Sequence, residues 1–196
     1  PLAGRLVEQG REVVGWGRNP NQQLGRTQNP GIPGKANQQL TVLGTIVGVA
    51  SGYVRSCAID NTGAMACTHH GVMATTGRDG VLCTAASIGG GGAVQLAGEY
   101  DTVCYLRGDG SVRCFGPTPS IYGDGAGSTA RYTHIGEATV TLSEAAVQVD
   151  VSTRHACAVL ASGKVQCWGT GGARLGYGHS DTIGDNELVS SQSPLQ

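Results

Sequence analysis

Residues 157–167 read Cys-Ala-Val-Leu-Ala-Ser-Gly-Lys-Val-Gln-Cys, and the fold can be inferred outward from this stretch. Folding it about its centre brings Cys157 opposite Cys167 and leaves residues 161–163 at the tip. A three-residue hairpin loop needs a left-handed backbone at its last position, which glycine adopts at little cost. The flanking valines and leucine favour strands. The stretch therefore predicts a β-hairpin with one cysteine on each strand.

The same pattern occurs twice more with cysteines and once without them. Cys57 and Cys67 bracket one copy, Cys104 and Cys114 bracket another, and each copy has a glycine at the corresponding tip position. Residues 5–17 align as a copy without cysteines, in which the glycine is shifted by one place. An aromatic residue and a glycine follow three of the four hairpins: Trp16-Gly17, Phe115-Gly116 and Trp168-Gly169. The chain therefore contains a repeated unit.

The period of this unit is about 50 residues, measured between equivalent positions of successive hairpins. Short strands and glycine-rich turns at such a period are typical of propeller blades or of another β repeat. We therefore expect an all-β chain built from a β repeat. Its approximate repeats are 1–45, 46–92, 93–145 and 146–196.

The composition fits a turn-rich β protein. Glycine accounts for 33 of the 196 residues, more than twice the usual share of about 7%, and charged residues make up 14% against about 25%. The formal net charge of −1 gives no electrostatic footprint for nucleic acid. No apolar run approaches the ~20 residues of a membrane span. Because the chain starts at Pro1 without a signal peptide, we expect either a processed protein or a piece of a longer one.

The spacing of the cysteines favours disulfides over metal ligation. Nine residues lie inside each pair, whereas only two to four residues lie between the paired cysteines of zinc knuckles. Opposed cysteines on paired strands can be bridged, and closing so small a loop is worth about 2–3 kcal/mol on the chain-entropy model. The alternative is reduced, buried thiols. Stable disulfides indicate an oxidising compartment, so we expect an extracellular or cell-surface protein.

The seventh cysteine, Cys83, has no partner in this scheme. A buried free thiol is one interpretation, and a bridge to another molecule is the other.

Several motifs resemble the repeat of the regulator of chromosome condensation family. The motifs are Ser152-Thr153-Arg154-His155-Ala156-Cys157, Ser162-Gly163-Lys164-Val165, Trp168-Gly169 and Leu175-Gly176-Tyr177-Gly178 in the last copy, Trp16-Gly17-Arg18-Asn19 in the first, and Tyr122-Gly123-Asp124-Gly125 in the third. The resemblance implies that residues 1–196 form a single β-propeller region. The fold of the family is a β-propeller, usually of seven blades with four strands each. The paired cysteines resemble secreted bacterial and algal versions of the repeat. Four hairpins do not make such a ring, so we expect it to be completed by further sequence or by another chain.

No residue pattern predicts catalysis. We expect no catalytic residue, no cofactor and no metal, since His69-His70 and the acidic residues Asp181, Asp185 and Glu187 lack the spacing of a ligand set. Loops on a rigid scaffold are where binding residues concentrate. The candidate interaction residues are therefore polar residues of two long loops: Arg18, Asn19, Asn21, Arg174, Tyr177 and His179.

These observations favour a non-catalytic extracellular scaffold that mediates protein–protein interaction. Its partner would be another protein or copies of itself, as in a homo-oligomer, a surface assembly or a filament, with no nucleic acid and no membrane span. The alternative is a regulator or inhibitor of another enzyme, either like a nucleotide-exchange factor or like a hydrolase inhibitor, that binds through propeller loops.

Overall fold

The computed structural model describes residues 3–6, 13–16, 34–35, 44–52, 55–69, 83–84, 92–100, 102–116, 119–126 and 137–196. The chain divides into two compact units, residues 1–101 and 102–196, and each is described by itself. Within the described ranges the regular structure consists of β-strands and short 3₁₀ helices, with no α-helix. The prediction of an all-β chain is therefore confirmed.

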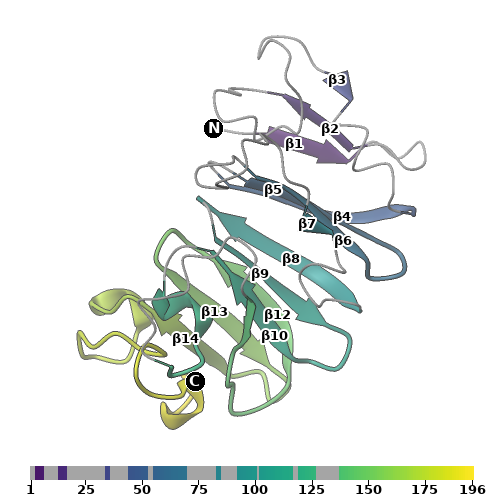
Figure 1. Cartoon of the computed structure of the whole chain (residues 1–196). Helices are drawn as coiled ribbons and strands as arrows, with labels where there is room; N and C mark the ends of the chain where they lie inside the picture. The colour runs from purple at the N-terminus through teal and green to yellow at the C-terminus, as the bar shows by residue number, and fades with distance from the viewer. Residues whose placement is uncertain are drawn as a thin grey trace. The chain divides into compact units, whose positions relative to one another are not determined.

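The described residues of the first unit form two antiparallel sheets together with the strand β8 (Figure 1). One sheet has the order β1-β2-β3, and the other has the order β4-β5-β6-β7. The bounds are β1 (Ala3–Leu6), β2 (Val13–Trp16), β3 (Gly34–Lys35), β4 (Ile46–Ser51), β5 (Arg55–Asp60), β6 (Met65–His69), β7 (Cys83–Thr84) and β8 (Ala93–Glu99). Strand β8 lies against β4 and β5.

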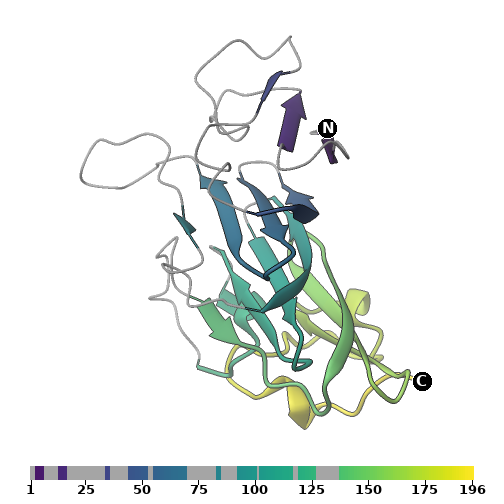
Figure 2. The same ribbon diagram turned by 90° about the vertical axis from the view of Figure 1, so that its right-hand side faces the viewer.

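In the second unit, β11, β10 and β9 are successive neighbours in one antiparallel sheet, and β12-β13-β14 form another. The strands are β9 (Thr102–Arg107), β10 (Val112–Phe115), β11 (Glu137–Thr139), β12 (Ala146–Val151), β13 (His155–Leu160) and β14 (Val165–Gly169). The 3₁₀ helices are η2 (Pro119–Tyr122), η3 (Ala173–Leu175) and η4 (Val189–Ser191). The yellow C-terminal segment lies beside the green strands in both views (Figures 1 and 2).

The three cysteine-bearing hairpins turn where the sequence predicts. Gly63, Gly110 and Gly163 have φ angles of 78°, 81° and 83°, in the region that side chains disfavour. Each of these glycines donates its N–H to the carbonyl three residues earlier, at 2.9–3.0 Å. Local turn chemistry thus fixes the register, and the register brings the cysteines opposite one another.

The core of the second unit is built around Trp168. The indole is fully buried, and its Nε1 donates to the carbonyl of Ile121, 2.8 Å away. Tyr105, Phe115 and Tyr122 are also fully buried. A buried tryptophan needs a partner for its N–H, and η2 supplies one. This bond links β14 to a segment 47 residues earlier in the chain.

Candidate functional site

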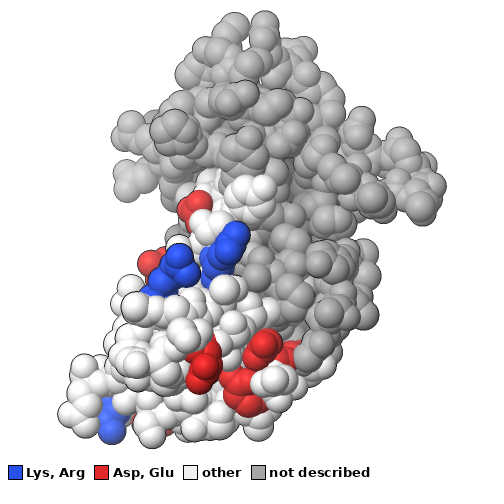
Figure 3. All heavy atoms as spheres, turned by 90° about the vertical axis from the view of Figure 1, so that its left-hand side faces the viewer, with Lys and Arg blue, Asp and Glu red and all other residues white. Residues whose placement is uncertain are grey.

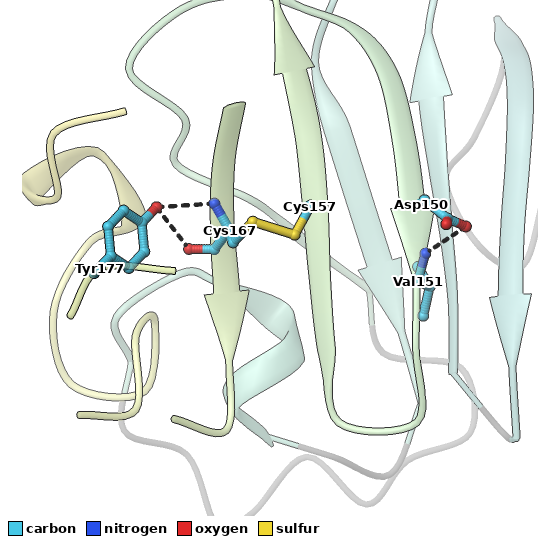
Figure 4. The surroundings of a disulfide bond; sticks show 5 residues. All are labelled: Asp150, Val151, Cys157, Cys167 and Tyr177. Atoms are coloured by element: carbon cyan, nitrogen blue, oxygen red, sulfur yellow. Dashed lines mark hydrogen bonds between the residues drawn. A yellow bond between two sulfur atoms is a disulfide. The ribbon is translucent and has the colours of Figure 1, made fainter. Parts of the chain in front are cut away.

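The outer edge of β14 is covered by single residues of the C-terminal segment in place of a fourth strand. The hydroxyl of Tyr177 accepts the amide N–H of Cys167 at 2.9 Å and donates to the carbonyl of the same residue at 3.1 Å. Figure 4 shows the phenol ring on the side of β14 that faces away from Cys157. A single side chain therefore satisfies both backbone groups of an edge residue.

Two backbone bridges continue this cover on either side of Tyr177. Val165 and Leu195 exchange two hydrogen bonds, at 3.0 and 2.7 Å, and so do Gly169 and Ile183, at 2.9 and 3.0 Å. Unpaired strand edges are the usual template for an added strand. Because positions 165, 167 and 169 all have partners, this edge is closed to strand addition.

The side chain of Gln166, on β14, holds the C-terminal segment through hydrogen bonds. This side chain is fully buried, and Nε2 donates to the carbonyls of Val189 (3.0 Å) and Gln192 (2.7 Å). Its Oε1 accepts from the N–H and the hydroxyl of Ser143, at 3.0 and 3.1 Å. All hydrogen-bonding positions of this buried amide are thus used. No sequence motif indicates this role for Gln166, although the residue shares a face of β14 with the buried Trp168.

Three disulfides crosslink the hairpins, in line with the predicted pairing of the cysteines. They join Cys57 to Cys67, Cys104 to Cys114 and Cys157 to Cys167, with Cα–Cα distances of 4.0–4.1 Å. The backbone groups of Cys167 point to Tyr177, away from β13. Directly opposed residues that exchange no hydrogen bonds approach more closely than hydrogen-bonded pairs, which accounts for the short Cα separations.

The polar loop after β14 folds back onto the end of that strand. Gly172 donates its N–H to the carbonyl of Ser180 at 3.0 Å. A Cβ atom at Gly171 would lie 2.1 Å from the carbonyl oxygen of Asp181, so only glycine fits there. Together with the bridge between Gly169 and Ile183, these contacts hold residues 171–182 as a closed loop.

The structure brings two of the predicted interaction residues together in this loop. The rings of Tyr177 and His179 are stacked, with centroids 5.8 Å apart, and Nδ1 of His179 lies 3.3 Å from a carboxylate oxygen of Asp181. Burial raises the pKa of Tyr177 above its ordinary value, and the hydrogen bond from Cys167 opposes the shift. Arg174 is exposed.

An open hollow with a cavity volume of about 490 Å³ lies next to this loop. Its lining includes the carboxylates of Asp181, Asp185 and Glu187 together with Thr182 and Gln192. Figure 3 views the molecule from the side on which the C-terminal loops lie in Figure 1, and acidic side chains gather on one part of that face. A basic group of a partner complements such a surface.

The remaining predicted residues have other locations. Arg18, Asn19 and Asn21 lie outside the described residues. Cys83 begins β7, where its backbone is paired with Cys67. Within the ranges that the structure describes, no group of three or more His, Cys, Asp or Glu side chains is arranged to hold a metal ion. Among the same residues, no helix has the length and hydropathy needed to cross a bilayer.

These sheets and their repeated hairpins define a class of protein: they are blades of a β-propeller. Residues 146–173 match the regulator of chromosome condensation (RCC1) repeat, which confirms the resemblance inferred from the sequence. This segment contains β12, β13 and β14. No curated protein matches the sequence.

Solved structures support the same fold. Yeast RCC1 (Prp20) bound to Kap60 superposes with a TM-score of 0.66 at 17% identity, over 94% of this chain and 47% of that one. Prp20p from Saccharomyces cerevisiae, studied for binding to Gsp1p and histones, gives 0.62 at 18% identity over 94% and 45%. Human WBSCR16 gives 0.62 at 17% identity over 82% and 43%. The chain thus spans less than half the length of the propellers that it matches.

Proposed function

We propose that the chain is a non-catalytic protein-binding module carried on RCC1-type propeller blades, and that it works outside the reducing interior of the cell. The observation that carries the proposal is the loop 171–187, which is held to the end of β14 and borders an acidic hollow. A rigid scaffold that presents a polar loop is a common arrangement for binding.

The chemistry of the hollow favours a partner with a basic segment. Asp181 is exposed, and Asp185 and Glu187 are half-buried on the same lining. Carboxylates at a rim attract cationic side chains, and such attraction weakens as salt is added. The fold neighbour Prp20p binds other proteins, Gsp1p and histones. Lysine- or arginine-rich segments of a secreted protein or of a surface polymer are therefore the proposed ligands.

Charge reversal at the hollow tests this proposal. Immobilised wild-type protein, an Asp181→Lys/Asp185→Lys variant and a Lys164→Glu control are exposed to secreted proteins of the source organism. Lys164 is exposed next to the tip of the β13–β14 hairpin and does not line the hollow, so Lys164→Glu reverses a surface charge outside the hollow. We expect a set of proteins that the wild type and the control retain and the double variant releases. Equal retention by all three would contradict the assignment of the hollow.

The extracellular location is part of the proposal and rests on the three disulfides, which persist in oxidising compartments. A more specific version of the proposed function is a structural subunit of a surface assembly or filament. In that version the binding partner is a second copy of the chain. Light scattering over a concentration series tests that version, since self-association raises the measured mass with concentration.

The second candidate function is regulation of another enzyme, in the manner of a nucleotide-exchange factor. It is favoured by the match of the fold to yeast RCC1 (Prp20). The disulfides argue against it, because such exchange takes place where thiols are kept reduced. Release of a fluorescent guanine nucleotide from a small GTPase, measured with and without the chain, distinguishes the two functions. Acceleration would favour the second.

A further inference from the structure

Sheet β4-β5-β6-β7 places three cysteines in one row across three neighbouring strands. Cys57 on β5 is directly opposite Cys67 on β6, and Cys67 is directly opposite Cys83 on β7. Directly opposed residues of antiparallel strands lie on the same face of a sheet. Cys57 and Cys67 form a buried disulfide. The seventh cysteine of the chain therefore occupies the register position next to an existing disulfide.

The two pairings in this row have different but compatible geometries. The Cα atoms of Cys57 and Cys67 are 4.0 Å apart, as in a pair that exchanges no hydrogen bonds. The backbone groups of Cys67 then point toward β7, so its pair with Cys83 is the hydrogen-bonded kind, with an ordinary Cα separation of about 5.5 Å. Disulfides are most common at separations of about 5.5–6 Å. The backbone register of either pairing is thus one at which disulfides form.

The other two cysteine-bearing sheets lack a third cysteine at this position. In the sheet β9-β10-β11, Ala138 stands opposite Cys114. In the sheet β12-β13-β14, the hydroxyl of Tyr177 meets the outward backbone groups of Cys167. The two sheets without a third cysteine therefore serve as internal controls.

We propose that Cys57, Cys67 and Cys83 form a thiol–disulfide exchange site. The thiolate of Cys83 attacks Sγ of Cys67, the bond between Cys57 and Cys67 breaks, and a bond between Cys67 and Cys83 forms. Cys57 leaves as a thiolate and takes up a proton. One disulfide and one thiol are present before and after the step, so no external oxidant or reductant is consumed.

The exchange moves the covalent crosslink from the β5–β6 hairpin to the edge of the sheet. Before exchange the bond joins residues 10 positions apart within one hairpin. After exchange it ties β7 to β6, and the free thiol lies on β5, an inner strand of the sheet. The site thereby switches which strand pair is covalently held, and the switch depends on the supply of thiolate, which rises toward the ordinary thiol pKa of about 8.5.

Peptide mapping of the full chain without reduction tests the proposal. Samples held at pH 6 and at pH 8.5 are quenched in acid, alkylated under denaturing conditions and digested. Cleavage at Asp60 separates Cys57 from Cys67, and cleavage at Arg78 separates Cys67 from Cys83. We expect the alkyl label on both Cys83 and Cys57, with a larger share on Cys57 after the pH 8.5 incubation. Label confined to Cys83 at both pH values would overturn the proposal.

Two variants keep the test decisive. In Cys57→Ser the attacked bond is absent, and we expect Cys67 and Cys83 to form a disulfide during oxidative refolding; two free thiols there would contradict the register argument. Ala138→Cys builds the same row next to the disulfide between Cys104 and Cys114, and we expect label on Cys104 as well. Exchange in this engineered row without exchange in the native one would also count against the proposal.

Discussion

The hydroxyl oxygen of Tyr177 lies 2.9 Å from the amide nitrogen and 3.1 Å from the carbonyl oxygen of Cys167, so a phenol takes the place of a fourth strand. Removing the hydroxyl in Tyr177→Phe leaves both backbone groups without this partner. A buried group left unsatisfied costs about 1–3 kcal/mol. We expect the free energy of unfolding in urea to fall by about that amount. Ser190→Ala removes an exposed hydroxyl, and we expect a change within about 0.5 kcal/mol.

The burial of Tyr177 has a consequence at high pH. The pKa of Tyr177 is raised by burial, so the unfolded chain loses its phenol proton first as the pH increases. The stabilisation is complete below the unfolded pKa of about 10 and is lost as the pH rises above it. In urea titrations between pH 8 and 11, this alkaline loss should be smaller in Tyr177→Phe. An identical alkaline loss in the variant would contradict the assignment.

Gly169 is required by its conformation and by its neighbours. Its φ is +111°, and a Cβ atom would lie 2.5 Å from the carbonyl oxygen of Arg154 and 2.6 Å from Cα of His155. Gly163 is a matched control, because its φ is +83° and a Cβ there would meet nothing within 4 Å. We expect Gly163→Ala to cost about 1–2 kcal/mol from the left-handed backbone alone. Gly169→Ala should lower the free energy of unfolding clearly more, as measured by thermal and urea unfolding. Equal losses in the two variants would show that the contact of the added Cβ with Arg154 and His155 has no effect.

Gln166 should control the C-terminal segment selectively. Gln166→Met keeps a long side chain of similar size but leaves the carbonyls of Val189 and Gln192 and the N–H of Ser143 without this partner. We expect a loss of about 2–4 kcal/mol, since several buried groups lose their hydrogen bonds together. Amide hydrogen exchange at Leu195 and Val165 should accelerate more than at Cys157. Uniform acceleration over the sheet would instead indicate global destabilisation.

Asp60 should make the β5–β6 hairpin sensitive to acid. Burial opposes the charge of its carboxylate, but hydrogen bonds from the hydroxyl and N–H of Thr62 and from the N–H groups of Gly44 and Ala64 outweigh burial and lower the pKa. A lowered folded pKa stabilises above the unfolded value of about 3.9, and the contribution disappears as the pH falls below it. We expect Asp60→Asn to be less stable at neutral pH and to lose less between pH 5 and 2.

The control for this prediction is Glu99→Gln, which removes an exposed carboxylate from the same unit. Its acid unfolding profile should follow that of the wild type. If the Asp60 variant also follows the wild-type profile, the hydrogen bonds to this carboxylate do not set the acid stability.

The sequence predicts those parts of the fold that depend on neighbours along the chain. The tip glycines and the opposed cysteines lie within single hairpins, so turn chemistry and spacing determine them. The cover on β14 depends on residues 177, 183 and 195, and no local pattern relates these positions to the strand. For this reason Tyr177 was predicted only as a loop residue for interaction, whereas its hydroxyl contacts Cys167.

The hydrogen-bond partners of Gln166 could not be predicted from the sequence either. Its alternation with Trp168 places it on a core face, but its partners at positions 143, 189 and 192 come from distant segments. The acidic hollow depends on the same folding back of the C-terminal segment. The sequence shows its carboxylates, and only the structure shows that they share a lining.

Paired cysteines crosslink the neighbouring strands of each cysteine-bearing hairpin. Alkylation of the denatured chain, counted by mass spectrometry before and after reduction, tests this crosslinking most directly. We expect one modified cysteine of the seven without reduction and all seven after it, whichever bond the exchange site holds. Seven modified cysteines without reduction, in protein isolated from its natural source, would contradict the crosslinked hairpins and the oxidising location together.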